Sequence, residues 1–199
     1  MWIGLVGSEM CIRDRMEHYY ELPMNIFVTD PSPTISAQVL PDKHVVKMPL
    51  ESCQMLSIIF SHWYHNWGDD LLKKKDGVPY KTSKGAFRNH PCTQWAAASM
   101  PNLAWLIEHG IALSNEYTHR YGKIHSCAAP LHESREIFNA RSKTDVSCYP
   151  LVKSFTRAMP DEYKHNTRID TFTAYKTYIA SKPWAASNYL RDPSRKPNW

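Results

Sequence analysis

The sequence lacks the signatures of several familiar enzyme classes. It has no glycine-rich loop of the kind that cradles phosphates, no zinc-deaminase signature (His-x-Glu with Pro-Cys-x-x-Cys) and no pattern typical of a Ser/His/Asp triad. It also has no internal repeat, no heptad run and no stretch that reads as a domain linker. At 199 residues, the chain can bury the core of one domain without disulfides or metal ions. These observations predict a single domain whose chemistry comes from some other arrangement of side chains.

Cysteine is scarce and scattered. The five cysteines are odd in number, far apart and never in a CxxC motif, at positions Cys11, Cys53, Cys92, Cys127 and Cys148. A disulfide framework normally shows an even number of cysteines in a short secreted chain. The pattern therefore predicts reduced thiols in a reducing compartment.

The first 23 residues look foreign to the rest of the chain. The stretch MWIGLVGSEMCIRDR has neither a basic leader nor an apolar run long enough for a signal peptide or a membrane span. It resembles translated adapter sequence, so we expect residues 1–23 to be a non-native or disordered extension and residues 24–199 to form a single helical domain. Without residues 1–23, which carry two arginines and four acidic residues, the net charge rises from +5 to +7. Such a charge is compatible with a polyanionic partner.

Helical periodicity begins soon after Met24. The apolar run NIFVTD (25–30) is typical of a buried strand or an extended entry segment. The segment 34–67 has helical spacing, with Pro41 and Pro49 as boundaries or kinks. We expect Pro49 to lie in the first turn of a helix that ends near Trp63.

The second half of the chain continues the helical pattern. Residues 92–123 read as two helical stretches broken near Pro101, and residues 170–190 as a last helix. A polar, glycine-containing loop spans residues 68–91. The sequence thus predicts a mainly α fold, a single compact helical domain with long loops and a short N-terminal extended segment.

One of the predicted helices carries a narrow polar stripe on an otherwise apolar surface. At about 100° per residue, His44, Lys47, Glu51 and Gln54 fall within roughly 80° of one another. A buried or cleft-facing row of titratable groups needs either partners or a chemical role. Lys47 and Glu51 could form only an i, i+4 ion pair. Together with His44, they could instead be catalytic residues.

A second polar block, Arg88-Asn89-His90-Pro91, follows a lysine-rich loop and precedes a Trp-containing helix. The block could merely cap that helix, and the loop could be merely solvated. Alternatively, both could form a surface for phosphates and bases. On the second interpretation, the nucleic-acid-binding residues are Lys43, Lys81, Lys84, Arg88, Asn89 and His90.

Histidine spacing gives little support for a metal site. His62 and His65 have the i, i+3 spacing of some metal ligands, but no third ligand lies near them in the sequence. We therefore expect these histidines to pack at a helix end, and we expect neither a metal ion nor a cofactor.

The two polar blocks resemble the pyrimidine-dimer DNA glycosylase family, of the endonuclease V type found in phages and some bacteria. The first block matches at Val39-Leu40, Lys43-His44, Lys47, Glu51 and Gln54-Met55-Leu56. The second matches at residues 88–91 and at Trp95. The chain is also similar, from MNIF to the closing Trp199, to a set of phage proteins that carry no stated activity.

The resemblance implies a mainly helical fold and a base-excision reaction. In this family an amine attacks the sugar C1′, a carboxylate assists departure of the damaged base, and the resulting imine permits strand cleavage by β-elimination. Glu51 matches the catalytic glutamate. The amine is either the processed N-terminal amine or Lys47, whose pKa burial would lower.

The resemblance also implies a partner and a place of action. We expect a monomer that acts on double-stranded DNA, without a membrane, in the cytoplasm of a bacterium or of a phage-infected cell. Two other interpretations stay open at this point. The scaffold could modify free nucleotides or phage bases without cutting DNA, or it could bind nucleic acid without catalysis.

Overall fold

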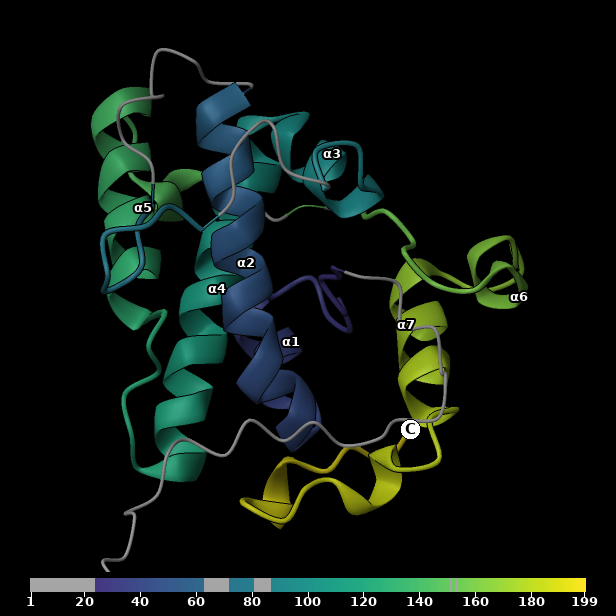
Figure 1. Cartoon of the computed structure of the whole chain (residues 1–199). Coiled ribbons are helices and arrows are strands. Elements are labelled where there is room, and N and C mark those ends of the chain that lie inside the picture. The colour runs from purple at the N-terminus through teal and green to yellow at the C-terminus, as the bar shows by residue number, and fades with distance from the viewer. Residues whose placement is uncertain (1–23, 63–71, 81–86, 151, 153) are drawn as a thin grey trace, which may run out of the picture.

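Three long helices run side by side and form the body of the structure (Figure 1). They are α2 (Asp42–His62), α4 (Met100–Tyr121) and α5 (Ala128–Ser142), and α4 packs against both of the others. The predicted mainly α fold is confirmed. The computed structural model describes residues 24–62, 72–80, 87–150, 152 and 154–199.

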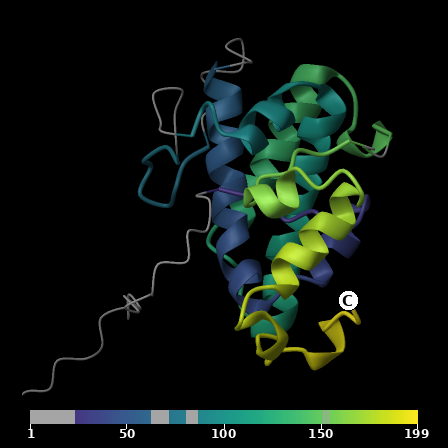
Figure 2. The same cartoon turned by 90° about the vertical axis from the view of Figure 1, so that its right-hand side faces the viewer.

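Shorter elements surround this body. Helix α1 (Pro33–Gln38) packs on α4, and α3 (Pro91–Ala97) packs on both α4 and α2. Helices α6 (Asp161–Lys164) and α7 (Thr171–Ala180) pack on each other, and α7 crosses one side of the long helices (Figures 1 and 2). Three short 3-10 turns complete the described part: η2 (Val146–Cys148), η3 (Ala185–Ser187) and η4 (Pro193–Arg195).

Some predictions fall on residues outside the described ranges. The expected N-terminal extension, residues 1–23, is one of them. The others are the lysines Lys81 and Lys84 and the histidine His65. These predictions stay untested.

The predicted break near Pro101 is confirmed, because α3 ends at Ala97 and α4 begins at Met100. The hydroxyl of Ser99 caps α4 by accepting a hydrogen bond from the Asn102 nitrogen at 3.3 Å. Pro101 stands in the first turn, where a helix needs no backbone N–H. The break therefore follows from the chemistry of the residues themselves.

The prediction that Pro49 begins a helix is wrong. Helix α2 continues through Pro49, and Pro41 stands immediately before its first residue. An internal proline removes one N–H donor and costs about 3 kcal/mol or more. Burial of α2, Pro49 included, offsets this cost. In the turn before the proline, His125 Nε2 also lies 3.1 Å from the carbonyl oxygen of Val46.

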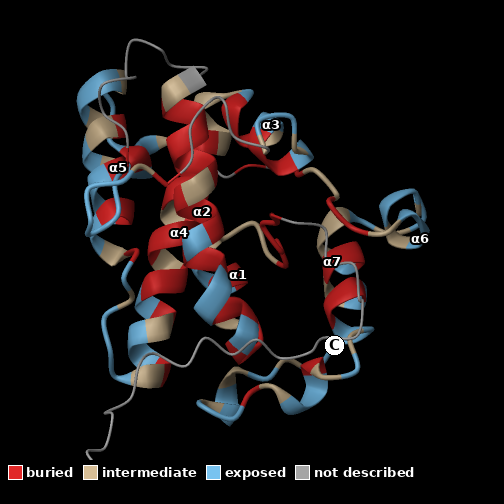
Figure 3. Ribbon diagram, viewed as in Figure 1, coloured by how far each residue is buried: buried red, intermediate tan, exposed pale blue. Residues whose placement is uncertain are grey.

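Residues 24–29 are buried, as the apolar run predicts, but they form irregular backbone and not a strand. Phe27 has a φ of 39°, in the left-handed region that residues other than glycine rarely adopt. The side chain of Asn25 holds this turn. Its Oδ1 accepts hydrogen bonds from the backbone nitrogens of Ile26 (2.8 Å) and Phe27 (3.0 Å). The segment lies between α2 and α7, among the buried residues shown in red (Figure 3).

A buried ion cluster fixes the start of α2. The Arg120 guanidinium donates to Asp42 Oδ1 at 2.9 Å and to Glu116 Oε1 at 2.8 Å. It also donates to two backbone carbonyl oxygens at the end of α1, at 2.8 and 2.9 Å. Arg195, near the C-terminus, donates to the same Glu116 oxygen at 2.9 Å. Three segments that are distant in sequence therefore meet at the first turn of α2: residues 38–42, residues 116–120 and Arg195.

We expect Arg120→Met to lower the free energy of unfolding by about 3 to 5 kcal/mol, because it leaves buried carboxylates without their main cation. Urea unfolding of both proteins measures this change. Arg191→Met is the matched control, since the exposed Arg191 side chain lies 5.1 Å from the Tyr121 ring centre, and the substitution keeps the backbone nitrogen that donates to Asp42 Oδ2 at 3.1 Å. A loss for Arg120→Met no larger than for Arg191→Met would show that the cluster does not anchor α2.

His109, in the middle of α4, is a buried neutral histidine. Its ring stacks on Trp105 with 4.6 Å between centres, and Nδ1 lies 3.0 Å from the carbonyl oxygen of Pro33. Burial lowers the pKa of His109 from 6.5 to about 4, against the opposing effect of the Pro33 carbonyl. The unfolded chain therefore binds a proton that the folded chain does not. This contribution to stability is present above pH 6.5 and is lost as the pH falls toward 4.

We expect His109 alone to account for a loss of about 2 kcal/mol in unfolding free energy between pH 7 and pH 4.5. His109→Phe keeps an aromatic ring beside Trp105 but cannot bind the proton. The variant should therefore lose about 2 kcal/mol less over this range, whatever its stability at pH 7. Urea unfolding at both pH values gives the comparison. Equal acid losses in the two proteins would contradict the assignment.

Candidate active site

Glu51 is a buried carboxylate with a nitrogen atom against each of its two oxygens. Oε2 accepts a hydrogen bond from the backbone nitrogen of Asn25 at 2.8 Å. Oε1 lies 3.0 Å from Lys47 Nζ. The Glu51 side chain is 7% exposed, whereas that of Lys47 is 49% exposed. The i, i+4 ion pair is thus present, and a second partner from outside the helix joins it.

The Asn25 nitrogen is held against Glu51 by a fixed turn. Besides the two bonds to its own segment, the Asn25 side chain donates from Nδ2 to the carbonyl oxygen of Ala158 at 2.7 Å. The Ala158 nitrogen donates to the hydroxyl of Tyr175 in α7 at 3.1 Å, and that hydroxyl donates to the Thr156 carbonyl at 3.0 Å. Tyr175 is fully buried. The C-terminal part of the chain therefore sets the position of the Asn25 nitrogen.

The first turn of α3 lies beside the same site. Thr93 Oγ1 is 3.5 Å from the sulfur of Met24, the buried residue that precedes Asn25. Burial, and after it the negative charge of Glu51, raises the pKa of the Cys92 thiol. The thiol therefore stays neutral close to the carboxylate. The start of α3, directly after the second polar block, therefore lies beside Glu51.

His90 acts as the cap of α3. Its Nδ1 accepts a hydrogen bond from the Cys92 nitrogen at 3.2 Å, and burial lowers the pKa of His90. A lower pKa favours the neutral ring, which has a nitrogen free to accept this bond. The sequence analysis left open whether the block at residues 88–91 caps the following helix, and His90 does cap α3.

His44 contributes a ring to an aromatic stack near the N-terminal segment. It is 2% exposed, and its ring lies over that of Phe27, 4.1 Å between centres and 18° from parallel. His44 also makes an edge-to-face contact with Trp184, and the two ring centres are 5.4 Å apart. His44 therefore packs among rings two turns before Glu51 on α2.

Two lysines lie over the rings of this stack. Lys43 Nζ is 4.9 Å from the ring centre of Trp184, which is partly exposed. Lys182 Nζ is 4.4 Å from the ring centre of Tyr178 and 5.8 Å from that of Trp184. We call Phe27, His44, Tyr178, Trp184, Lys43 and Lys182 the aromatic–lysine cluster. Phe27, His44 and Tyr178 are buried, so the partly exposed ring of Trp184 is the stacking surface of this cluster, with ammonium groups beside it.

The remaining predicted DNA contacts are more dispersed. Arg88 and Asn89 are exposed in the turn before α3. Their convergence with Glu51 in one cleft stays a prediction. Lys43 is exposed at the first turn of α2.

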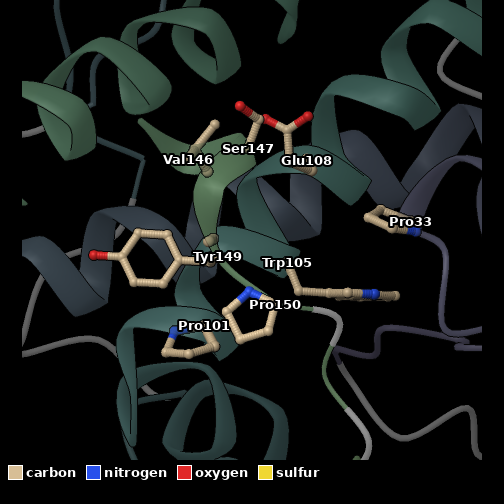
Figure 4. Close-up of a pocket in the computed structure, with 9 residues that line it drawn as sticks. Pro33, Pro101, Trp105, Glu108, Val146, Ser147, Tyr149 and Pro150 are labelled. Carbon is tan, nitrogen blue, oxygen red and sulfur yellow. The ribbon is translucent and has the colours of Figure 1, made fainter. Parts of the chain in front are cut away.

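A separate hollow of about 160 Å³ lies between α4 and the turn around η2 (Figure 4). Figure 4 shows the rings of Trp105, Tyr149 and Pro150 around it, with Glu108 at its edge. Glu108 is already paired with Arg135 through two hydrogen bonds of 2.9 Å. The hollow shares no lining residue with the Glu51 site.

Across the part of the chain that the structure describes, His, Cys, Asp and Glu side chains do not gather in threes that could hold a metal ion. Among the same residues, none of the helices is long and apolar enough to span a membrane.

The Glu51 arrangement suits catalysis by an amine. A buried carboxylate can take a proton from a nearby nitrogen or stabilise a cationic sugar. Lys47 carries an amine at this place. The Asn25 nitrogen is an amide while Met24 precedes it, and it becomes an α-amine when the chain starts at Asn25. The site therefore defines a class of helical protein in which a buried carboxylate, here Glu51, lies between a lysine amine and a backbone nitrogen that can become an α-amine.

Comparison with known proteins agrees with this class. The family model of pyrimidine dimer DNA glycosylase matches residues 24–129, more than half of the chain, and the protein belongs to that family. The resemblance drawn from the two polar blocks is thereby confirmed. No curated protein and no solved structure matches the chain. The matched segment contains Asn25, Lys47 and Glu51, whereas α7 and Trp184 lie outside it.

Sequence reasoning missed several residues of the site. It did not assign a role to the Asn25 side chain, to Tyr175 or to Trp184. One signal was available, since a polar residue at the start of a buried apolar run needs hydrogen-bonding partners. Nothing in the spacing of Tyr175 or Trp184 points to a segment about 150 residues earlier.

Proposed function

We propose that this protein is a monomeric DNA glycosylase that excises damaged or modified pyrimidines from double-stranded DNA. Glu51 is its catalytic carboxylate, and its nucleophile is the α-amine of Asn25, exposed when Met24 is removed. The observation that carries the proposal is the 2.8 Å contact between the Asn25 nitrogen and Glu51 Oε2. Membership of the pyrimidine dimer DNA glycosylase family supports it.

The reaction proceeds in two stages. The amine nitrogen forms a bond to the sugar C1′ while the bond from C1′ to the base breaks and the base leaves with its electron pair. Glu51 receives a proton from the amine and stabilises the cationic sugar. The sugar then opens to an imine, and loss of a C2′ proton expels the 3′ phosphate by β-elimination. AP-lyase activity is therefore part of the proposal.

The α-amine of Asn25 is the better nucleophile for two physical reasons. An α-amine has an ordinary pKa near 8, against about 10.4 for lysine, so more of it is unprotonated at neutral pH. The Asn25 nitrogen is also buried and fixed by its turn, whereas half of the Lys47 side chain surface is exposed. A fixed nucleophile loses less freedom on reaching the transition state. We assign Lys47 to charge balance and phosphate binding.

We propose that a DNA strand contacts the partly exposed groups around Trp184. Lys43 and Lys182 hold ammonium groups over the partly exposed ring of Trp184. Phosphate oxygens can bind these groups while an unpaired base stacks on the ring. We propose Lys43, Lys182 and Trp184 of the aromatic–lysine cluster, together with Arg88 and Asn89, as the DNA contact surface. Lys81 and Lys84 keep their predicted role in binding, and His90 supports the surface by capping α3.

We predict that a chain beginning at Asn25 forms a covalent adduct with dimer-containing duplex DNA when borohydride is present. Borohydride reduces the imine to a stable amine, so the adduct reports the nitrogen that attacked. Peptide mapping should place it on the Asn25 nitrogen. Retaining Met24 should slow adduct formation by about tenfold or more, because the new α-amine is displaced from Glu51.

Lys47→Met in the chain beginning at Asn25 is the control for the other amine. This variant should still form the adduct, although its DNA affinity should fall with the lost charge. An adduct mapped to Lys47, or one lost in Lys47→Met with folding intact, would overturn the assignment of the nucleophile. Absence of any adduct and of any excised base would overturn the glycosylase itself and leave DNA binding alone.

Glu51→Gln should lower single-turnover excision by about 10²-fold or more, because it keeps the shape of the side chain but removes its charge and basicity. DNA affinity should stay within a few-fold or rise, since a negative charge has left the site. Excision and thermal unfolding are measured on the same preparation, so that loss of folded protein is not counted as loss of catalysis.

Glu108→Gln is the matched control for Glu51→Gln. Glu108 is also an acid paired with a cation, Arg135, but it lies outside the site. Its variant should excise at the wild-type rate. A folded Glu51→Gln protein with wild-type excision would remove Glu51 from the mechanism.

A further inference from the structure

Cys53 and Cys127 meet on the side of α2 that packs against α5. Cys53 lies two residues after Glu51 in α2, and Cys127 immediately precedes the first residue of α5. Cys53 Sγ is 3.9 Å from the carbonyl oxygen of Cys127. Both residues are buried, and both are free thiols. Two free thiols therefore lie in neighbouring parts of the fold, and their residues are in contact.

The surroundings of Cys127 favour a thiolate. The hydroxyl of Tyr80 donates a hydrogen bond to Cys127 Sγ at 3.6 Å. Hydrogen bonds from Cys53 and Tyr80 lower the pKa of Cys127, although burial opposes them. Burial raises the pKa of Cys53, which therefore remains a protonated donor. The N-terminus of the 15-residue helix α5 adds a favourable dipole.

A pocket connects Cys127 with the surface. It has a volume of about 310 Å³, and its lining includes Leu50, Lys74, Lys75, Tyr80, Ser126 and Cys127. Lys74 and Lys75 are exposed, as is Asp76, which also lines the pocket, so these three residues together carry a net positive charge. A small neutral oxidant can enter a space of this size, and the positive charge further favours the anionic form of the sulfur.

We propose that Cys127 and Cys53 form a peroxide-reactive dithiol, with Cys127 as the attacking thiol and Cys53 as the resolving thiol. The Cys127 sulfur attacks hydrogen peroxide, so an S–O bond forms, the O–O bond breaks and hydroxide leaves. The sulfur of Cys53 then attacks the sulfenic acid of Cys127. An S–S bond forms, the S–O bond breaks, and the proton of the Cys53 thiol leaves with the hydroxyl group as water.

Exposure alone would predict a different order of reactivity. Cys148 is exposed, whereas Cys127 is 2% exposed, and Cys92 is fully buried near Glu51. If accessibility controlled oxidation, Cys148 would react first. If thiolate character and a nearby second thiol control it, the pair reacts first. The three kinds of cysteine in the described part of the chain thus form an internal comparison.

The experiment treats the reduced full chain with hydrogen peroxide, blocks the remaining thiols by alkylation after unfolding, and maps the peptides by mass spectrometry. The expected main product is a peptide pair joined through Cys53 and Cys127, with Cys148 still alkylated. Performing the oxidation in urea should abolish this preference, because unfolding separates the two thiols. Oxidation of Cys148 before Cys127, or joined pairs in random combinations from the folded protein, would overturn the proposal.

Two variants separate the roles of the two sulfurs. In Cys53→Ala, peroxide should stop at the sulfenic acid of Cys127, which dimedone traps. In Cys127→Ala, Cys53 should remain a thiol at the same peroxide dose. Thermal unfolding checks that each variant is folded, and the mapping of the unmodified chain decides the question if either is not. Trapping on Cys53 and not on Cys127 would contradict the assigned roles.

Discussion

The neutralisation of one buried carboxylate is the constraint on which the site depends. Glu51 stands on a helix that is buried on most sides, and an isolated charge there would be strongly unfavourable. The structure satisfies it from two directions, through Lys47 on the same helix and through the Asn25 nitrogen from an irregular segment. Because the second partner is a backbone group, its position requires a particular turn. The need to satisfy Glu51 is thus linked to the fold of the N-terminal segment.

Much of the remaining architecture keeps that turn in place. The side chain of Asn25 forms hydrogen bonds with its own segment and with the Ala158 carbonyl. The Ala158 nitrogen in turn donates to the hydroxyl of Tyr175 in α7. The Arg120 cluster fixes the start of α2 against α1, α4 and the C-terminal segment. These contacts join parts of the chain inside the family match to parts outside it. The region after residue 129 therefore helps to position the site and supplies Trp184, which contacts His44 two turns before Glu51 on α2.

The sequence predicted those features that leave a periodic or local signal. Helical spacing placed His44, Lys47 and Glu51 on one stripe, and Pro101 marked the break between α3 and α4. It could not predict the left-handed turn at Phe27, which depends on hydrogen bonds specific to the Asn25 side chain. The position of Pro49 inside α2 was misjudged, because burial of the helix overrides the local preference of proline. The contact between His44 and Trp184 joins residues 140 positions apart, and spacing carries no information about it.

The central claim is that the Asn25 nitrogen and Glu51 act together on one sugar carbon. The most direct test is a crystal structure of the chain beginning at Asn25, bound to duplex DNA that carries an unreactive analogue of the abasic sugar. The proposed mechanism predicts that the Asn25 amine lies about 3 to 3.5 Å from C1′. A Glu51 oxygen should lie within hydrogen-bonding distance of the same amine. A complex in which the sugar faces Lys47 with the Asn25 amine turned away, or in which Glu51 is remote from the sugar, would contradict it.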